Sequence, residues 1–565
     1  MNVMRISVSD WTRSGSPWVW LNAGAVAICI IMVLGLLALI AVRGLGHFWP
    51  ADVLSASYEQ SGQRSVLVGE LVESEFVPAA QLRDSGVDVP AGLEHMKRDL
   101  FKVGNRDITG ADFVWALDDR VTERSYPAMM FVAERREWGN LYGYLQAIKQ
   151  DGELVAQHDG YAPGPEYDAL WQDFQRRISR AQDLHAQIED IQKGVIGSIN
   201  YELERLRLKQ RSLELKNVTD PQPYADIEAR RNELDAEYEV LQVQLLELSN
   251  ALNRDSFVAE VADGRSVEVQ LSKVVRAFLP NSMHLGDKVV HYAAKIWEFI
   301  ADDPREANTE GGIFPAIYGT VMMVLLMSVM VTPFGVIAAV YLREYARQGF
   351  TTRVLRIAVN NLAGVPSIVY GVFGLGFFVY FLGGNIDDLF FAEAKPSPTF
   401  GTGGLMWASL TLALLTVPVV IVATEEGLSR IPRAVREGSL ALGATKAETL
   451  WKVVLPMASP AIMTGVILAI ARAAGEVAPL MLVGVVKLAP SLPLDMNYPY
   501  LHLDQKFMHL GFHIYDVGFQ SPNVEAARPL VYATALLLVV VIALLNFSAI
   551  AIRNHLREKY KALEM

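Results

Sequence analysis

Six stretches of this 565-residue sequence are long and apolar enough to cross a membrane, and they constrain its fold more than any other feature. The hydrocarbon core of a bilayer requires about 20 consecutive apolar residues in a helix. The first stretch is too long for the apolar core of a cleaved signal peptide, and no small-residue cleavage site follows it, so we expect an uncleaved anchor. The six stretches are residues 18–42, 313–341, 357–382, 405–423, 459–486 and 529–550.

Charged residues are concentrated between the first and the second stretch. Residues 51–312 hold 46 of the 62 acidic residues and 29 of the 50 basic ones, so this segment carries a net charge of −17 and the remainder +5. We therefore expect an acidic water-soluble insert beside an apolar membrane part, which excludes an ordinary soluble enzyme. The only cysteine, Cys29, lies in an apolar run, so no disulfide within the chain is possible.

Basic residues predict how the spans are oriented, because cytoplasmic loops carry an excess of lysine and arginine. The short loops after the second and fourth stretches and the tail 553–565 are basic, and the opposite loops less so. We expect residues 1–17 and the tail in the cytoplasm, and residues 43–312 outside, which is the periplasm of a Gram-negative cell. The basic residues are Arg343, Arg347, Arg353, Arg356, Arg430, Arg433, Arg436, Lys446, Lys452, Arg553, Arg557, Lys559 and Lys561.

The insert at 43–312 shows two patterns. Residues from about 51 to 165 alternate strand-like runs such as 65–72 with turn signals such as Asp151-Gly152, which predicts a β-rich module. Residues 170–255 show helical periodicity on both sides of a proline-rich break at 220–223, which predicts an antiparallel coiled-coil hairpin. Two short strands around Asp263-Gly264 should return the chain to the β module over residues 256–280. The apolar seam positions are Phe174, Ile178, Ala181, Ile188, Ile191 and Val195, then Ile227, Leu234, Tyr238, Leu241, Leu245, Leu248 and Leu252, with Arg231 as a polar fault.

The hairpin has two interpretations that the sequence leaves open. It is either an arm that docks an extracytoplasmic partner or a self-contained decoration of the membrane part. Because the insert is acidic, it would repel an anionic solute, so we do not expect it to collect one.

The cytoplasmic loop at 424–458 is the most informative segment. It reads EGSLALG from Glu437 to Gly443, and after nine residues it reads VVLP, which ends on Leu455 and Pro456. Two short helices joined at a glycine turn form a knob that can seat in a groove of another protein, and we expect Pro456 to end the second helix. The segment resembles the "EAA" coupling loop of ABC-importer permeases, in which Glu437, Gly443, Leu455 and Pro456 occupy the motif positions that contact the ATPase.

One similar pattern is a decoy. Gly438 and Gly443 have the spacing of a phosphate-binding P-loop, and Thr445 fits its Ser or Thr position, but Ala444 stands where the phosphate-binding Lys is required. This chain is therefore expected to bind no cofactor and no metal and to be no enzyme on its own, and ATP must be hydrolysed by another chain.

Three further strings resemble the phosphate-importer permease family known as PstA. They are NTEGGIFP at 308–315, NLAGVPSIVYG at 361–371 and ARAAGEVAPL at 471–480. The resemblance covers about residues 305–552 and not the insert, and Val422 stands near where many relatives carry an arginine. It implies a mainly α membrane protein with the six-helix type I ABC-importer fold, and a permease core at 313–552. Implied partners are a homologous permease chain, a dimer of ATP-binding cassette subunits, an extracytoplasmic phosphate-binding protein and membrane lipid, with no nucleic acid.

Four residues are candidates for the substrate pathway. Arg472 and Glu476 are ionisable residues inside an apolar stretch, where such groups are costly and mark pathways, and their spacing predicts one helical face. Their alternative role is a structural ion pair between subunits. Ser367 and Tyr370 follow a Gly-Val-Pro break in the third stretch and could offer hydroxyls to an oxyanion, or could mark only a packing kink.

The sequence thus predicts an inner-membrane permease subunit of an ATP-driven phosphate importer. A permease for another oxyanion, molybdate or sulfate, is the nearest alternative. A membrane-anchored scaffold built on the first span and the hairpin is the alternative from another class, and it leaves five spans and the loop unexplained.

Overall fold

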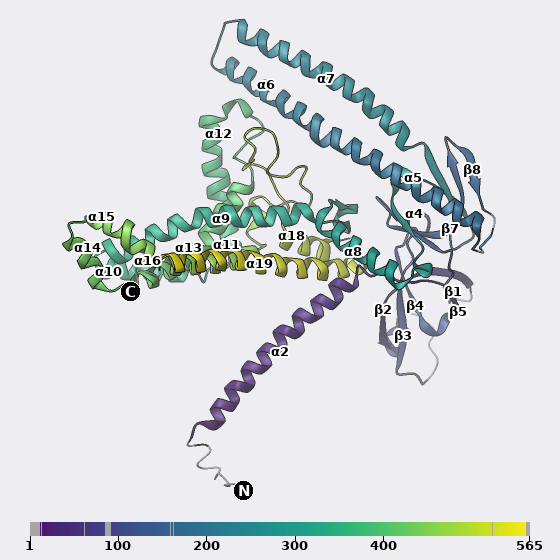
Figure 1. The fold of residues 1–565 in the computed structure, drawn as a ribbon, viewed down its shortest axis with the longest axis horizontal. Coiled ribbons are helices and arrows are strands. Elements are labelled where there is room, and N and C mark those ends of the chain that lie inside the picture. Colours follow the sequence, from purple (N-terminus) through teal and green to yellow (C-terminus); the bar gives the residue numbers. More distant parts are fainter. Residues whose placement is uncertain are drawn as a thin grey trace.

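The computed structural model describes residues 12, 14–60, 63–84, 92–158, 160–161, 163–521 and 524–560, so Lys561 of the expected basic tail lies outside the described part. Within it, six helices are long and apolar enough to cross a membrane. Figure 1 shows three parts: a helical bundle, a single helix that leaves it at an angle, and a two-sheet module that carries a long helical hairpin. The six helices run over Pro17–Gly46, Phe314–Tyr345, Ser367–Phe390, Leu405–Arg430, Lys446–Ala474 and Ala527–Glu558.

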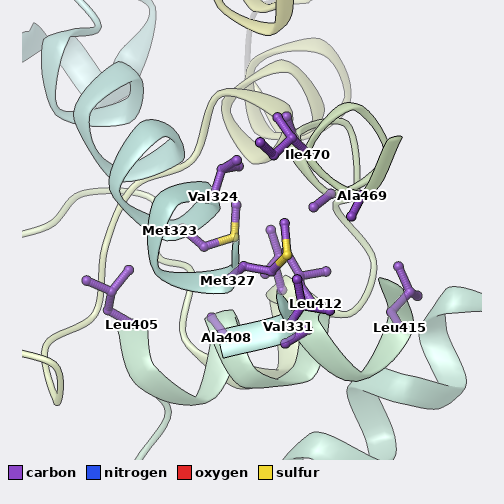
Figure 2. Packing of buried hydrophobic residues seen from close by; sticks show 14 of the residues in the cluster. Met323, Val324, Met327, Val331, Leu405, Ala408, Leu412, Leu415, Ala469 and Ile470 are labelled. Carbon is purple, nitrogen blue, oxygen red and sulfur yellow. The ribbon is translucent and has the colours of Figure 1, made fainter. Parts of the chain in front are cut away.

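The bundle is built on three helices, α9 (Phe314–Val340), α13 (Leu405–Arg430) and α16 (Leu455–Ala474), with α19 (Val524–Tyr560) against α16. Their shared core is apolar and buried, with methionines of α9 facing leucines of α13 (Figure 2). Small residues allow close approach: a Cβ added to Gly335 would lie 2.6 Å from a methyl carbon of Val420. In lipid, packing of this kind replaces the hydrophobic drive that holds soluble bundles together.

The first span, α2 (Ser16–Gly46), is almost free of the bundle, and no residue of its most apolar stretch is buried. Its last turn meets α19, where a Cβ on Gly44 would lie 2.9 Å from the backbone of Ala533. The rest of the helix points away from the other spans (Figure 1).

The third span differs from the prediction of 357–382. Residues 350–362 form a separate helix, α10 (Phe350–Leu362), and the span begins only at Ser367 with α11 (Ser367–Phe373). It continues through the π-helical segment η7 (Gly374–Gly383) into α12 (Gly384–Phe390). The break falls at Pro366, whose ring excludes helical geometry from the residue before it and removes a donor.

The fifth span also differs from the prediction of 459–486. It starts inside the loop with α15 (Lys446–Thr449), passes through the π-helical segment η9 (Leu450–Val454) and continues as α16 to Ala474. Gly475 ends it, and the chain then folds back through α17 (Leu480–Val483) toward a long connection before α19 that contains α18 (Leu510–Tyr515). The predicted segment was apolar to its end, but apolarity alone does not distinguish a helix from a buried turn. The fourth span likewise runs seven residues past the predicted end, to Arg430.

The β-rich module of the insert consists of two sheets. The first has the strand order β4-β3-β2-β1-β5, and the second β10-β9-β7-β6-β11 with β8 beside β7. The strands are β1 (Val53–Gln60), β2 (Gln63–Pro78), β3 (His95–Lys102), β4 (Phe113–Leu117), β5 (Val121–Ser125), β6 (Phe131–Arg135), β7 (Asn140–Gln150), β8 (Glu153–Gln157), β9 (Asp255–Glu260), β10 (Ser266–Gln270) and β11 (Val274–Phe278).

The hairpin extends well beyond the part of it that packs against the second sheet. Its first arm is α5 (Pro165–Glu189), the π-helical segment η2 (Asp190–Ile196) and α6 (Gly197–Leu215), and its second arm is α7 (Gln222–Leu252). The predicted seam is wrong for the start of the first arm: Phe174, Ile178 and Ala181 pack into the core of the second sheet rather than against α7 alone. A helical period identifies an apolar face and does not identify what covers it.

Ion pairs join the module to α8 (Leu285–Ala301), the helix that leads to α9. Lys295 lies with its Nζ 2.8 Å from a carboxylate oxygen of Glu134 on β6, and a guanidinium nitrogen of Arg276 on β11 lies 3.3 Å from a carboxylate oxygen of Glu298. The hairpin touches the bundle as well, because the Tyr201 hydroxyl on α6 donates to the Tyr498 carbonyl in the connection before α19. Within the insert, the β module is therefore held to α8, the helix that leads into the second span, and the hairpin touches the membrane part separately.

Candidate functional site

The loop between the fourth and fifth spans forms a helix-turn-helix knob at one end of the bundle (Figure 1). Helix α14 (Arg433–Ala441) ends at a turn in which Gly443 has φ 89°, a left-handed conformation that favours glycine. Thr445 then caps α15, accepting from the backbone N–H of Glu448, whose carboxylate accepts from the Thr445 N–H. Glu437 is exposed on α14, so the knob presents a charged outer face.

Two residues that the sequence analysis did not single out hold this knob in place. Arg436 of α14 donates to a Glu344 carboxylate oxygen at 2.9 Å and to the carbonyl oxygens of Ile431 and Leu428. Glu344 stands at the end of the second span, and its carbonyl also accepts from Lys446. The knob is thereby tied to the ends of the second and fourth spans. In the sequence, Arg436 is one of the basic residues that predict the orientation of the spans, and nothing there indicates that it pairs with Glu344.

Pro456 does not end the second loop helix, contrary to the prediction. The helix runs without interruption from Lys446 to Ala474. Pro456 has no backbone N–H to donate. The π-helical segment η9 lies directly before Leu455 and Pro456, and its hydrogen bonds reach one residue further than those of an α-helix, so the helix tolerates the missing donor. Leu455 packs at the edge of the buried cluster that joins the second, fourth and fifth spans. One helix therefore connects the knob with the opposite end of α16, which lies inside the bundle beside α9 and α13.

The Arg472–Glu476 pair lies at that opposite end of α16. The Arg472 Nε is 3.8 Å from a Glu476 carboxylate oxygen, and the two side chains are 33% and 21% exposed. The prediction that they share one helical face is wrong, because α16 ends at Ala474 and Glu476 lies in the turn that follows. The turn folds the carboxylate back toward the guanidinium, so the pair forms by a different geometry.

Tyr370 and Ser367 sit at the start of the third span near this pair. Tyr370 is 4% exposed and belongs to the same buried cluster as Ala473 and Ala474, next to Arg472. Its hydroxyl donates to the Leu362 carbonyl at 2.5 Å across the break before α11. The hydroxyl therefore stabilises this break and already has a hydrogen-bond partner. Ser367 is half-buried as the first residue of α11.

The candidate residues thus form two groups joined by one helix. Glu437 and Gly443 belong to the knob, with Leu455 and Pro456 following it at the start of α16, and Arg472 with Glu476 lies at the far end of α16, near Tyr370. At 1.5 Å per residue, the 20 residues of α16 span about 30 Å, which is the thickness of a bilayer's hydrocarbon core. Among the described residues, no cluster of His, Cys, Asp or Glu is arranged to hold a metal ion.

Comparison with known proteins agrees with this architecture. The family model described as "Binding-protein-dependent transport system inner membrane component" matches residues 331–562, which include both groups. The phosphate transport system permease protein PstA 1 of Mycobacterium tuberculosis is 37% identical over 245 residues, 43% of this chain and 71% of that protein. The probable ABC transporter permease protein YqgH of Bacillus subtilis is 33% identical over 195 residues, 34% of this chain and 59% of that protein.

The match therefore spans between 59% and 71% of the length of these two relatives. A solved structure of the MetNI methionine ABC transporter is 19% identical, with a TM-score of 0.31, and covers 43% of this chain and 94% of that one. This chain belongs to the family of binding-protein-dependent transport system inner membrane components: it is a multi-span permease subunit of an ABC importer. Within that family it is of the PstA type.

Proposed function

We propose that this chain forms half of the membrane path for inorganic phosphate in an ATP-driven importer. It pairs with a homologous permease chain, two copies of an ATPase and an extracytoplasmic phosphate-binding protein. The knob faces the cytoplasm, where the ATPase binds it through the exposed face of α14 and the Gly443 turn. The insert lies on the opposite side of the membrane.

The observation that carries the proposal is the uninterrupted helix from Lys446 to Ala474. An ATPase that closes on the knob displaces one end of this helix, and Arg472 stands at its other end. Helices are stiff over this length, so a shift at the knob reaches the charged pair without an intermediate element. The Arg436 anchor supports the same role, because it makes the ends of the second and fourth spans follow the knob.

Phosphate suits the chemistry of the charged pair. A guanidinium presents N–H donors in a fork that matches two oxygens of an oxyanion. At 3.8 Å, Glu476 neutralises Arg472 without a short hydrogen bond, so an arriving anion can compete for the guanidinium. The same carboxylate then repels the anion and keeps its binding weak enough for release. In this scheme the pair belongs to the path that opens to alternate sides of the membrane during the transport cycle.

Uptake of labelled phosphate into vesicles that contain this chain with its partner subunits tests the proposal. We expect uptake to require ATP and the binding protein, and excess unlabelled sulfate or molybdate to leave it unchanged. Inhibition by molybdate or sulfate at the concentrations at which unlabelled phosphate inhibits would instead support the other-oxyanion permease. Phosphate uptake that continues without this chain would refute both.

A further inference from the structure

The loop end of the bundle contains a second feature that the coupling role does not use. A cavity of about 640 Å³ lies between the last turn of α13, the first turns of α16 and the last turns of α19. Arg430, Arg553 and Arg557 line it together with apolar side chains, among them Ile431, Met457 and Ala461. Within the described part of the chain, no carboxylate lines this cavity.

The three arginines make only weak contacts with other side chains. Arg430 approaches Glu426 only at 3.9 Å, and both side chains are largely exposed at 80% and 66%. Arg553 donates to the side-chain oxygen of its neighbour Asn554 at a long 3.4 Å. Among the described residues, Arg557 has neither an ion pair nor a hydrogen bond through its side chain. Three cations that share one concave site repel one another unless an anion joins them.

The position of the cavity indicates the kind of anion. It lies where the fourth and sixth spans end, beside residues 457–464 of the fifth span, so its apolar wall faces the outer part of the acyl-chain region and its arginines reach the headgroup level. Basic pockets between spanning helices on the cytoplasmic side suit anionic headgroups, and a cytoplasmic leaflet is negatively charged. An apolar wall below a basic rim fits an amphiphile better than a free ion.

We propose that this cavity binds a phosphate-bearing anion at the membrane surface, the headgroup of an anionic phospholipid, with its glycerol and upper acyl chains against Ile431, Met457 and Ala461. The bound headgroup would connect α19 with the root of the knob, because Arg430 and Ile431 directly precede α14. Inorganic phosphate has the same charged group and is the other source of this chemistry. The proposal does not depend on what the importer carries.

Native mass spectrometry of the purified full-length chain during lipid titration tests the proposal. The double variant Arg553→Gln/Arg557→Gln is compared with Arg347→Gln/Arg353→Gln, which removes two exposed arginines at the same end but outside the cavity. Each arginine near an anionic headgroup strengthens binding about fivefold, so the cavity variant should bind phosphatidylglycerol about 25-fold more weakly and the control variant nearly normally. Phosphatidylcholine with the same acyl chains should bind poorly to all three proteins.

A second arm distinguishes the two sources of the anion. Millimolar inorganic phosphate that leaves phosphatidylglycerol bound identifies the lipid as the occupant. If phosphate displaces the lipid from the wild type and does not bind the cavity variant, the occupant is free phosphate. The cavity is then still an anion-binding site. Equal weakening by both variants, or equal binding of phosphatidylcholine and phosphatidylglycerol, would overturn the proposal. Because glutamine supports helices, unchanged melting of both variants is the expected folding control.

Discussion

At the scale of single residues, Arg472 illustrates how one intramembrane charge can be identified before its geometry is known. An arginine in an apolar stretch is costly, so its presence already indicated a pathway or a structural pair. The structure adds that Glu476 reaches it from a turn rather than from the helix, at 3.8 Å. A turn can rearrange without breaking a helix, so the pair can open when a substrate arrives.

Replacement of Arg472 tests the pathway role. Lysine keeps the charge and loses the fork, so Arg472→Lys should retain part of the phosphate uptake. Arg472→Gln removes the charge and should reduce uptake by at least about 100-fold, since a lost buried charge contact costs about 3 kcal/mol. The measurement is uptake into vesicles, with the amount of assembled complex determined in parallel. Normal transport by the glutamine variant, or failure only because the complex falls apart, would contradict the role.

At the scale of elements, the knob depends on one backbone conformation. Gly443 has φ 89°, whereas Gly438 lies within α14, and an added Cβ at either position meets no atom within 4 Å. Substitutions at Gly443 and Gly438 therefore differ in the backbone strain that they cause, and not in the space available to the new side chain. The structure assigns the requirement for glycine at 443 to its left-handed geometry.

The two glycines give a matched pair of variants. Gly443→Val should cost about 1–2 kcal/mol at the turn and abolish uptake while the protein still reaches the membrane, because a β-branched residue strongly disfavours this conformation. Gly438→Ala should transport normally and make α14 more stable by up to about 1 kcal/mol. ATPase stimulation by the binding protein and phosphate uptake are measured together. Normal values of both in Gly443→Val would refute the coupling role of the loop.

The joint between the β module and α8 predicts an acid-sensitive contribution to stability. Burial alone would raise the pKa of the Glu134 carboxyl, but the Lys295 and Arg276 cations outweigh it and lower that pKa from 4.5 to about 2. The unfolded chain then binds the proton more readily than the folded one. The ionised form of Glu134 therefore stabilises the fold above about pH 4.5, and this stabilisation is lost as the pH falls through about 2.

Glu134→Gln should accordingly lower the free energy of unfolding near pH 7 by about 3 kcal/mol, and the difference from the wild type should shrink as the pH falls below 4.5. Unfolding of the purified chain, followed by tryptophan fluorescence across this pH range, provides the measurement. Glu153→Gln on the exposed strand β8 is the control and should parallel the wild type. A Glu134→Gln deficit that does not change with pH would show that packing, not charge, explains the effect.

At the scale of the whole molecule, the two parts of the insert make separate contacts. Its β module is tied by an ion pair to α8, the helix that leads into the second span, and its hairpin contacts the connection before α19 through Tyr201. Its hairpin starts at the β module, at the end opposite the knob, and extends back until its tip lies above α12 (Gly384–Phe390) (Figure 1). Deletion of residues 170–255 would also remove Phe174 and Ile178 from the sheet core, so it would damage the module and not only the arm.

Labelling tests the predicted topology. A cysteine at Gln222, exposed at the start of α7 near the hairpin tip, in a Cys29→Ser background should react with an impermeant thiol reagent in intact cells after outer-membrane permeabilisation. A cysteine at exposed Arg433 of the knob should react only after the inner membrane is broken. The reverse pattern would invert the topology and place the knob on the side away from the ATPase.

The number of spans, the position of the insert along the chain, its β-rich and helical parts, and the loop with Glu437 and Gly443 could all be predicted from the residues alone. These features rest on local composition and spacing, which a chain displays before it folds. The limits of the third and fifth helices, the side chains that cover Phe174, and the way Glu476 reaches Arg472 became clear only from the folded protein. Each of these depends on which turns pack against other elements, and an apolar segment looks the same in sequence whether it continues as a helix or folds back.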